Sequence, residues 1–508
     1  PLPQELRDRY QLIPLATALR HIHFPPDHTQ LNLARRRLVF DEFLDLQLDL
    51  PQRRRQQQQQ ASAPLNPQGE LMEQFCQQLP FQLTKAQQRV VAEILADLER
   101  PIPMNRLVQG DVGSGKTVVA VIALLAAVQS GYQAALMAPT EILAEQHYGK
   151  LLEWLNPLHV SVERLTGSVR PAKRRQILAQ LATGDLSVLV GTHALLQETV
   201  AFQRLGLVVI DEQHRFGATQ RAKLQAKGLL PHVLSLTATP IPRTLALTLY
   251  GDLDVSQIDE LPPGRPPIQT LVLRRSQRSF AYDLIRREVA QGRQAYIVLP
   301  LVEQSEKHDL KSAIAEHQRL QTEIFPDFRL GLLHGRLSAR DKQDTLQAFA
   351  RGEISILVAS TVVEVGIDVP NATVMLIEHA ERFGLAQLHQ LRGRVGRGAQ
   401  RAYCLLVNGS RYDTDGATER LNVLAQSQDG FFIAEMDLRL RGPGEVFGTR
   451  QSGLPDFALA SLVTDQDCLE AARAAASELI AQDPDLQNYP LLQAVLQQRR
   501  ERRCTTLS

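Results

Sequence analysis

A glycine-rich segment at residues 110–117, with the sequence GDVGSGKT, constrains the fold of this chain more than any other feature. It follows a short apolar run at residues 106–109 and precedes a helical run at residues 118–128. A strand, a glycine-rich turn and a helix start are the context that a phosphate-binding P-loop requires. A glycine-rich loop that binds nothing is the alternative, but the complete spacing in this context predicts a nucleotide site.

The P-loop contains the groups that hold a nucleotide and its metal ion. Its backbone N–H groups can close around a polyphosphate, and the helix N-terminus adds a partial positive charge. We expect these N–H groups to belong to Gly110, Gly113, Ser114 and Gly115. We expect Lys116 to reach the outer phosphates and the Thr117 hydroxyl to hold Mg²⁺, so ATP and Mg²⁺ are the expected cofactors.

The composition of the chain excludes several classes of protein. Its 508 residues are enough for about three or four domains, and its net charge of +1 leaves nucleic-acid binding to local grooves. Four widely spaced cysteines form no CxxC pair, which indicates a reduced cytosolic protein without a zinc site or disulfide framework. The sequence has no apolar run long enough for a membrane span and no signal peptide. It begins Pro-Leu-Pro without a Met, so we expect an N-terminal portion to precede it.

Residues 1–62 are predicted to form a helical connector and a Gln-rich linker. Helical spacing places Phe40, Phe43 and Leu44 on one face of a run at residues 33–44. The three arginines at residues 35–37 either contact phosphates or form a solvated helix face, and the pattern favours the solvated face. Three more arginines and five glutamines then form a low-complexity linker or an interrupted helix, where we place a domain boundary.

Residues 63–410 alternate short apolar runs with helical runs, which predicts mostly parallel sheets wrapped by helices. In the first unit, residues 63–262, strands are expected near residues 106–109, 134–138, 160–165, 187–190, 207–210 and 233–236, with a helix at 141–155. A proline-rich hinge opens the second unit, residues 263–410, where strands are expected near residues 268–273, 295–299, 330–333, 354–358, 374–377 and 402–407. The fold class is therefore α/β with two tandem parallel-sheet units, followed by a C-terminal region at residues 411–508.

An acidic pair completes the predicted ATPase site of the first unit. Asp211 and Glu212 follow a buried apolar run, so Asp211 is expected to orient Mg²⁺ and Glu212 to activate the attacking water as general base. The alternative, an acid pair that only caps a helix, is disfavoured beside a complete P-loop. The hydroxyls of Thr237 and Thr239 are candidates for relaying phosphate state into movement, or they form purely local turns.

A short segment before the P-loop is a candidate site for the base of the nucleotide. The amide of Gln87 can pair with an adenine edge, and the ring of Phe81 can stack on the base. Taken alone, the segment is a helix cap at Thr84 followed by an amphipathic helix.

The second unit contains an arginine-rich segment, residues 389–398, with the sequence HQLRGRVGRG. An arginine presented from a second domain stabilises the charge that develops on a transferred phosphoryl group. Such a cluster alone is more often a nucleic-acid or surface patch, but opposite a P-loop the arginine-finger interpretation is favoured for Arg394 and Arg397. Upstream, Asp368 is placed to contact the ribose, or it belongs to an ordinary strand-to-loop turn.

These motifs stand in the order of superfamily-2 helicase motifs over most of residues 79–400. They include residues 87, 110–117, 138–141, 166–168, 211–214, 237–240, 361–370 and 390–397. Within that superfamily the chain resembles the bacterial RecG-type ATP-dependent DNA helicases. Residues 430–445 and 447–453 are similar to the translocation motif that this family shares with the transcription-repair coupling translocase.

The resemblance implies two RecA-like motor domains with ATP held between them, moving on double-stranded DNA. It assigns Gln390 to catalysis and Gly366 to the nucleotide site. DNA contacts or coupling are implied for Thr140, Thr166, Gly167, Thr192, Thr237, Thr239, Arg439, Arg441 and Arg450, although a solvated helix face is the alternative for the three arginines. The implied partners are branched DNA (stalled forks and Holliday junctions, remodelled by branch migration) and a single-stranded-DNA-binding protein. The family further implies a monomer at the bacterial nucleoid.

Alternative functions remain open at this stage. The family's N-terminal wedge domain, an OB-fold that engages the branch point, is not expected in this chain, so ATP hydrolysis is predicted more firmly than junction recognition. A transcription-repair coupling translocase would need an RNA-polymerase-binding module before the motor, and residues 1–78 show no such β-rich domain. An RNA helicase of the DEAD type would carry Asp-Glu-Ala-Asp at residues 211–214, where this chain has Asp-Glu-Gln-His. A nucleotide-dependent binding switch that moves nothing is the alternative from a different class.

Overall fold

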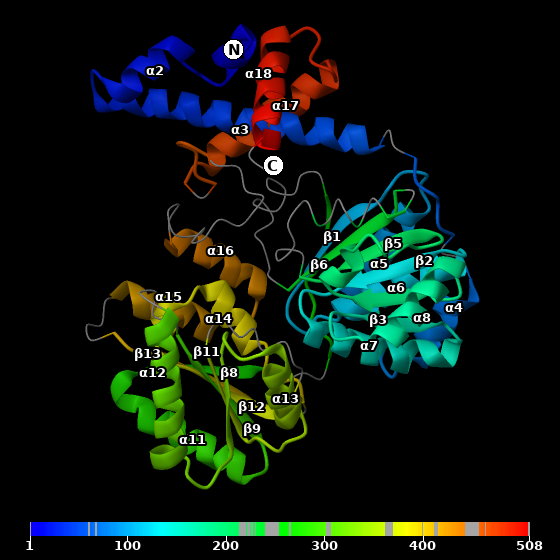
Figure 1. The fold of residues 1–508 in the computed structure, drawn as a ribbon. Helices are drawn as coiled ribbons and strands as arrows, with labels where there is room; N and C mark the ends of the chain where they lie inside the picture. The colour runs from blue at the N-terminus through cyan, green and yellow to red at the C-terminus, as the bar shows by residue number, and fades with distance from the viewer. Residues whose placement is uncertain are drawn as a thin grey trace.

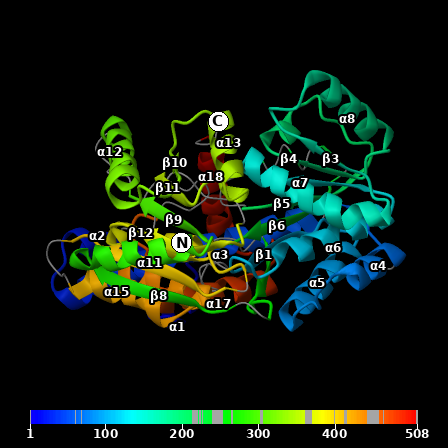
Figure 2. The ribbon, with the colours of Figure 1, turned by 90° about the horizontal axis from the view of Figure 1, so that it is seen from below.

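The chain folds into two α/β lobes and a helical module (Figure 1). The structure is a computed structural model that describes residues 2–58, 61–66, 69–212, 220, 224, 227–228, 230–238, 253–263, 266–300, 306–360, 369–398, 400–410, 415–441, 457–462 and 464–505. Figure 2 shows the two lobes next to each other from a second direction. Within these described ranges, no helix is both long enough and apolar enough to cross a membrane.

The first lobe is a parallel sheet with the strand order β3-β4-β2-β5-β6-β1-β7. Its strands are β1 (Asn105–Gly110), β2 (Gln133–Met137), β3 (Val162–Leu165), β4 (Val188–Gly191), β5 (Leu205–Ile210), β6 (His232–Thr237) and β7 (Asp254–Ile258). Its helical segments are α4 (Glu70–Gln78), α5 (Lys85–Leu98), α6 (Lys116–Gln129), α7 (Glu141–Leu155), η1 (Asn156–Leu158), α8 (Pro171–Thr183) and η2 (His193–Leu196). Helix α6 is apolar on every side and is buried from Val118 to Ala127, as expected for a helix inside a lobe. Every predicted strand of this unit is confirmed, and β7 is an additional one.

The second lobe is a parallel sheet with the order β10-β11-β9-β12-β13-β8. Its strands are β8 (Ile268–Arg274), β9 (Gln294–Leu299), β10 (Leu330–Leu333), β11 (Ile356–Ser360), β12 (Ala372–Ile377) and β13 (Ala402–Asn408). Its helical segments are η4 (Arg275–Gln277), α11 (Arg278–Ala290), α12 (Glu306–Arg319), η5 (Leu320–Ile324), α13 (Ala339–Ala350), η6 (Ala380–Arg382), α14 (Leu385–Arg392), α15 (Asp415–Gln426) and α16 (Gly430–Arg441). The strands predicted for this unit are all present, which confirms the α/β fold class with two parallel-sheet units.

The helical module is formed by the two ends of the chain. It contains α1 (Gln4–Arg9), α2 (Leu15–His23), α3 (His28–Gln58), α17 (Gln466–Gln482) and α18 (Pro490–Thr505). Phe40, Phe43 and Leu44 of α3 are buried in its core together with residues of α17, which confirms their predicted common face. Helix α3 continues through Pro51 to Gln58, so the low-complexity stretch begins inside a helix.

The arginines of α3 correct one prediction. Arg37 is 1% exposed and donates hydrogen bonds to Asp41 and to the carbonyl of Ile13. Arg35 makes a two-pronged ion pair with Asp465, over distances of 2.6 and 2.8 Å. The predicted solvated face is therefore wrong at Arg37, which is buried in the helical module, whereas the Arg35 side chain is 41% exposed and Arg36 is exposed.

The C-terminal region is divided between two bodies. Helices α15 and α16 place Leu421 and Ile433 in the core of the second lobe. Helices α17 and α18 instead pack in the helical module. The carboxylate of Glu42 in α3 accepts hydrogen bonds from the backbone N–H groups of Ala458, Leu459 and Ala460, which lie just before α17.

A buried histidine ties the segment that follows α3 to the first lobe. The Nδ1 atom of His232 accepts a hydrogen bond from the Met104 N–H group (3.0 Å), so its Nε2 atom carries the proton and donates to the Ala63 carbonyl (2.9 Å). Leu65 completes the attachment by packing in the core of the lobe. Burial lowers the pKa of His232 from its ordinary value of 6.5.

This histidine predicts that the first lobe loses stability in mild acid. The unfolded chain takes up a proton at His232 below pH 6.5, while the folded imidazole does so only at lower pH. Its contribution is therefore complete above pH 6.5 and is lost as the pH falls through the folded pKa. Thermal unfolding at pH 7.5 and pH 5.5 should show a larger drop in Tm for the wild type than for His232→Gln; equal drops would contradict the assignment.

Candidate active site

The P-loop between β1 and α6 has the backbone geometry that its glycines predict. Gly113 and Gly115 both have a φ of +82°, in the left-handed region that favours glycine. A Cβ atom on Gly115 would lie 2.2 Å from the Gln87 amide nitrogen, so a side chain there would displace that amide. Ser114 is fully buried, and Thr117 is half-buried in the first turn of α6.

Lys116 lies at the centre of the candidate site. Its ammonium group donates hydrogen bonds to the carbonyls of Gly110 (2.7 Å) and Asp111 (2.8 Å). Burial lowers the pKa of Lys116, while the carboxylates of Glu212, Asp211 and Asp111 raise it. The positive charge of Arg397, which belongs to the second lobe, lowers it further. Lys116 therefore shares one electrostatic environment with the acidic pair and with an arginine from the opposite lobe.

The acidic pair follows β5 directly. Burial opposes ionisation of Asp211, but a hydrogen bond from His147 (2.8 Å) and the charges of His147 and Lys116 hold the pKa of Asp211 below its ordinary value. Glu212 has a φ of +51°, and its carboxylate accepts a hydrogen bond from the Ala238 N–H group. This bond connects the acidic pair to Ala238, the residue that follows Thr237 at the end of β6.

His147 is a site residue that the sequence analysis missed. It lies on α7, and its side chain is 12% exposed. The only sequence feature that could have indicated His147 was its place on the helix that Thr140 caps. Thr140 caps that helix by accepting a hydrogen bond from the Leu143 N–H group. This position indicates a contact with Asp211 only when α7 is known to lie beside β5.

The second lobe presents its arginines from the end of α14. Arg397 donates a hydrogen bond from Nε to the Gly393 carbonyl (3.3 Å). Gln390, Arg394 and Arg397 are all half-buried. The predicted proximity of Arg397 to Lys116 is present, while the catalytic roles of all three side chains stay predictions.

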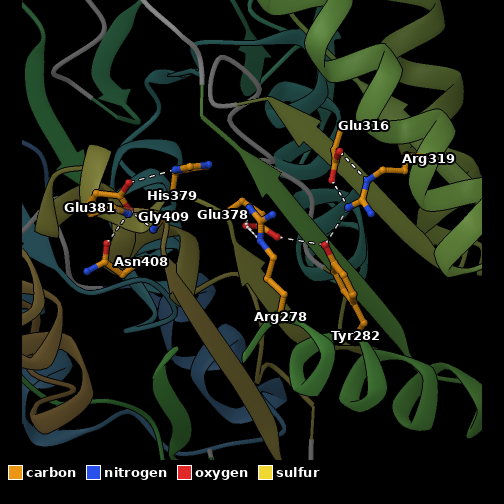
Figure 3. A network of polar contacts seen from close by, with 10 residues as sticks. Arg278, Tyr282, Glu316, Arg319, Glu378, His379, Glu381, Asn408 and Gly409 are labelled. Carbon is orange, nitrogen blue, oxygen red and sulfur yellow. Dashed lines mark hydrogen bonds and ion pairs between the residues drawn. The ribbon is translucent and has the colours of Figure 1, made fainter. Parts of the chain in front are cut away.

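Two polar clusters hold the loop between β12 and α14 in place (Figure 3). In one, Glu378 accepts two hydrogen bonds from Arg278 of α11 (2.9 and 2.6 Å) and one from Tyr282, whose hydroxyl in turn accepts from Arg319. In the other, Glu381 contacts His379 (3.2 Å) and accepts from the Gly409 N–H group (2.9 Å). These contacts anchor the segment between β12 and α14 to α11 and to the residue that follows β13.

The candidate base site is only partly arranged for adenine. The Gln87 amide accepts from the Thr84 N–H group (2.9 Å) and donates to the Ser114 carbonyl (2.8 Å), which confirms the predicted cap and supports the P-loop. Phe81 is 46% exposed and lines a cavity of about 500 Å³ together with Leu83 and Gln88. The pairing of Gln87 with a base stays a prediction.

The predicted DNA contacts of the first lobe lie along one edge of its sheet. Thr140, Thr166 and Thr192 follow the carboxyl ends of the neighbouring strands β2, β3 and β4. Thr140 and Gly167 are exposed, whereas Thr166 and Thr192 are buried. The buried hydroxyl of Thr192 has no hydrogen-bond partner among the described residues.

Other predicted site residues are only partly visible. Arg439 of α16 is 64% exposed and pairs with Glu435 one helical turn away. Arg441 ends α16, and its side chain lies outside the described part. The positions that lie wholly outside the described residues are Gly366, Asp368, Thr239 and Arg450.

Family models match three parts of the chain. The DEAD/DEAH box helicase model matches residues 84–248, and the helicase conserved C-terminal domain matches residues 277–399. The model "ATP-dependent DNA helicase RecG, domain 3, C-terminal" matches residues 427–508.

Individual relatives cover almost the whole chain. An ATP-dependent DNA helicase RecG from Synechocystis is 66% identical over 99% of this chain and 60% of its own length. The protein of that name from Bacillus subtilis is 48% identical over 95% of this chain and 71% of its own length. A solved structure of RecG bound to a three-way DNA junction superposes with a TM-score of 0.77 at 45% identity, over 92% of this chain and 61% of that chain. The chain belongs to the RecG family of ATP-dependent DNA helicases.

Proposed function

We propose that this chain is an ATP-dependent motor that moves on double-stranded DNA, migrates Holliday junctions and reverses stalled replication forks. The chain spans 60% of the length of the Synechocystis relative, so the activity of the longer protein is part of the proposal. Branched DNA as the substrate is supported by the junction-bound relative. The proposal extends to a monomer at the bacterial nucleoid that contacts a single-stranded-DNA-binding protein.

One observation carries the proposal. Lys116 of the first lobe lies within electrostatic reach of Asp211 and Glu212 on one side and of Arg397 from the second lobe on the other. A nucleotide bound at this seam would have its phosphates cradled by one lobe and its developing negative charge stabilised by the other. Binding and hydrolysis would then favour different arrangements of the lobes, which is what a motor requires.

The residues present fit a magnesium ion. Thr117 and Asp211 offer a hydroxyl and an ionised carboxylate, which are hard oxygen ligands. Within the described residues no group of three or more His, Cys, Asp or Glu side chains forms a metal site, and Mg²⁺ needs few protein ligands when phosphates supply the others. When bound, the ion would neutralise charge on the phosphates, while Glu212 would take a proton from the attacking water.

DNA would be held along the exposed edge of the first lobe. Thr140 and Gly167 are accessible there, and the unpartnered Thr192 hydroxyl could donate to a phosphate once its surroundings open. Contacts of this kind carry little sequence information, which suits an enzyme that acts on junctions of any sequence.

The proposed function is tested by ATP turnover and fork regression. Turnover should rise strongly on adding duplex or junction DNA, since indifference to DNA would favour the binding switch. Fork regression should be compared between this chain and the longer Synechocystis relative. Turnover without regression in this chain, but with regression in the relative, would assign junction recognition to parts found only in the longer protein.

The arginines of α16 should separate hydrolysis from movement. Arg439→Ala and Arg441→Ala should leave DNA-stimulated turnover within about twofold of wild type, because Arg439 lies on an exposed face of α16 and pairs with Glu435 of the same helix. They should reduce branch migration by about tenfold, as expected when a phosphate contact or lever is lost. Glu435→Ala is the matched control, since it removes the partner of Arg439 but no positive charge. Parallel loss of both activities would point to a folding defect.

A further inference from the structure

Asp111, the second residue of the P-loop segment, joins the two lobes. Its Oδ1 atom lies 2.6 Å from Nε2 of His389 in α14, although 278 residues separate the two in sequence. The same oxygen accepts a hydrogen bond from the Val112 N–H group (2.7 Å). Burial opposes ionisation of Asp111, but the hydrogen bond from His389 holds the pKa of Asp111 below its ordinary value. The P-loop carboxylate is therefore an anion held by the opposite lobe.

The partners of His389 define the tautomer of its ring. Nη2 of Arg392 lies 2.7 Å from Nδ1 of His389, and a guanidinium group can only donate, so Nδ1 must accept. The proton of the neutral ring is then on Nε2, where it is donated to Asp111. Arg392 is 2% exposed, and its other nitrogen donates to the carbonyls of Leu424 and Ser427. The imidazole of His389 is therefore held at both of its nitrogens, by Asp111 and by Arg392.

The backbone next to this pair is also built for close approach. A Cβ atom on Gly393 would lie 2.7 Å from the Cβ of Val112, too close for any side chain. Ile142 of α7 adds a third contact, because it packs against the apolar core of the second lobe. The two lobes therefore meet beside the P-loop through a polar bond, a glycine contact and an apolar contact.

We propose that His389, supported by Arg392 and by the bare backbone of Gly393, is a positioning residue that holds Arg394 and Arg397 in register with Lys116 by binding Asp111. In this role His389 acts through Asp111 and Arg392, its two hydrogen-bond partners, and not on the reacting atoms themselves. It sets the distance between Arg394 and Arg397, which follow the end of α14, and the phosphates that the P-loop would bind. Those arginines are needed only when negative charge develops on the transferred phosphoryl group. A change in their distance from Lys116 therefore affects ATP turnover, whereas nucleotide binding depends on the first lobe. The inference rests on the proposed ATP hydrolysis.

The test is a double-mutant cycle on the full chain. His389→Ala and Asp111→Ala should each lower kcat for ATP about a hundredfold, the effect of a displacement of about 1 Å at a reacting centre. If the two side chains act only through each other, the double variant should be no slower than the slower single variant. His389→Gln, whose amide can still donate to Asp111, should recover part of the rate. The Kd of a fluorescent ATP analogue for His389→Ala should stay within about threefold of wild type.

Glycine variants give an independent measurement. Gly393→Ala should lower kcat in the same way, whereas Gly416→Ala in α15, where an added Cβ meets no atom of the described residues within 4 Å, should not. The exposed His23→Ala is the control for histidine removal. Wild-type kcat in His389→Ala, multiplicative effects in the double variant, or loss of analogue binding in His389→Ala would each overturn the inference. A wild-type chain without ATP turnover would instead refute the proposed function.

Discussion

Lys116→Ala should abolish ATP turnover, with a loss of about a thousandfold or more in the presence of DNA. The ammonium group rests on the Gly110 and Asp111 carbonyls and is surrounded by carboxylates, so no neighbouring cation of the first lobe takes its place in the described structure. Phosphate release measured with saturating duplex DNA checks this expectation.

Two further variants make the result interpretable. Lys116→Met keeps the aliphatic stem without the charge and should fail to the same extent, which separates loss of the cation from loss of packing. Lys150→Ala removes an exposed lysine of the same lobe and should retain turnover. DNA-stimulated turnover in Lys116→Ala would refute the assignment of the site.

Arg397→Ala should keep nucleotide binding but slow hydrolysis by about a thousandfold, the lower end of what removal of an arginine finger costs. The positive charge of Arg397 acts on Lys116 from the second lobe, whereas the P-loop that would bind the phosphates belongs to the first lobe. A fluorescent ATP analogue should therefore bind with near wild-type affinity, while the rate of single-turnover ATP hydrolysis should fall by about a thousandfold.

The neighbouring arginines provide the controls for this expectation. Arg401→Ala removes an exposed guanidinium four residues away and should leave the rate unchanged. Arg394→Ala tests whether the second candidate shares the role. An unchanged rate in Arg397→Ala would remove the finger function from this residue.

Much of the fold could be predicted because local patterns determine it. The expected helix at residues 141–155 coincides with α7, whose start is set by the Thr140 cap. The P-loop could be predicted with its neighbouring strand and helix, because glycines with positive φ leave few alternatives. Strand β7 was missed because Asp254, Ser256 and Gln257 interrupt its apolar pattern; it is an edge strand that pairs only with β1 in the described sheet.

The polar contacts of the site could not be predicted, because they depend on distant parts of the chain. His147 and Asp211 are 64 residues apart, and Asp111 and His389 are 278 apart. No periodicity in either segment indicates the other. For the same reason the burial of Arg37 was missed, since a run of three arginines is usually solvated and only the packing of α3 buries one of them.

The helical module has a consequence for synthesis on the ribosome. The ion pair between Arg35 and Asp465 joins residues 430 positions apart. At about 5 to 20 residues per second, the first partner waits roughly 20 to 90 s for the second. During that interval both lobes are translated, while Phe40, Phe43 and Leu44 have no α17 to cover them. The earliest helices of this chain are thus among the last to reach their native packing, and chaperones have the longest access to that apolar face.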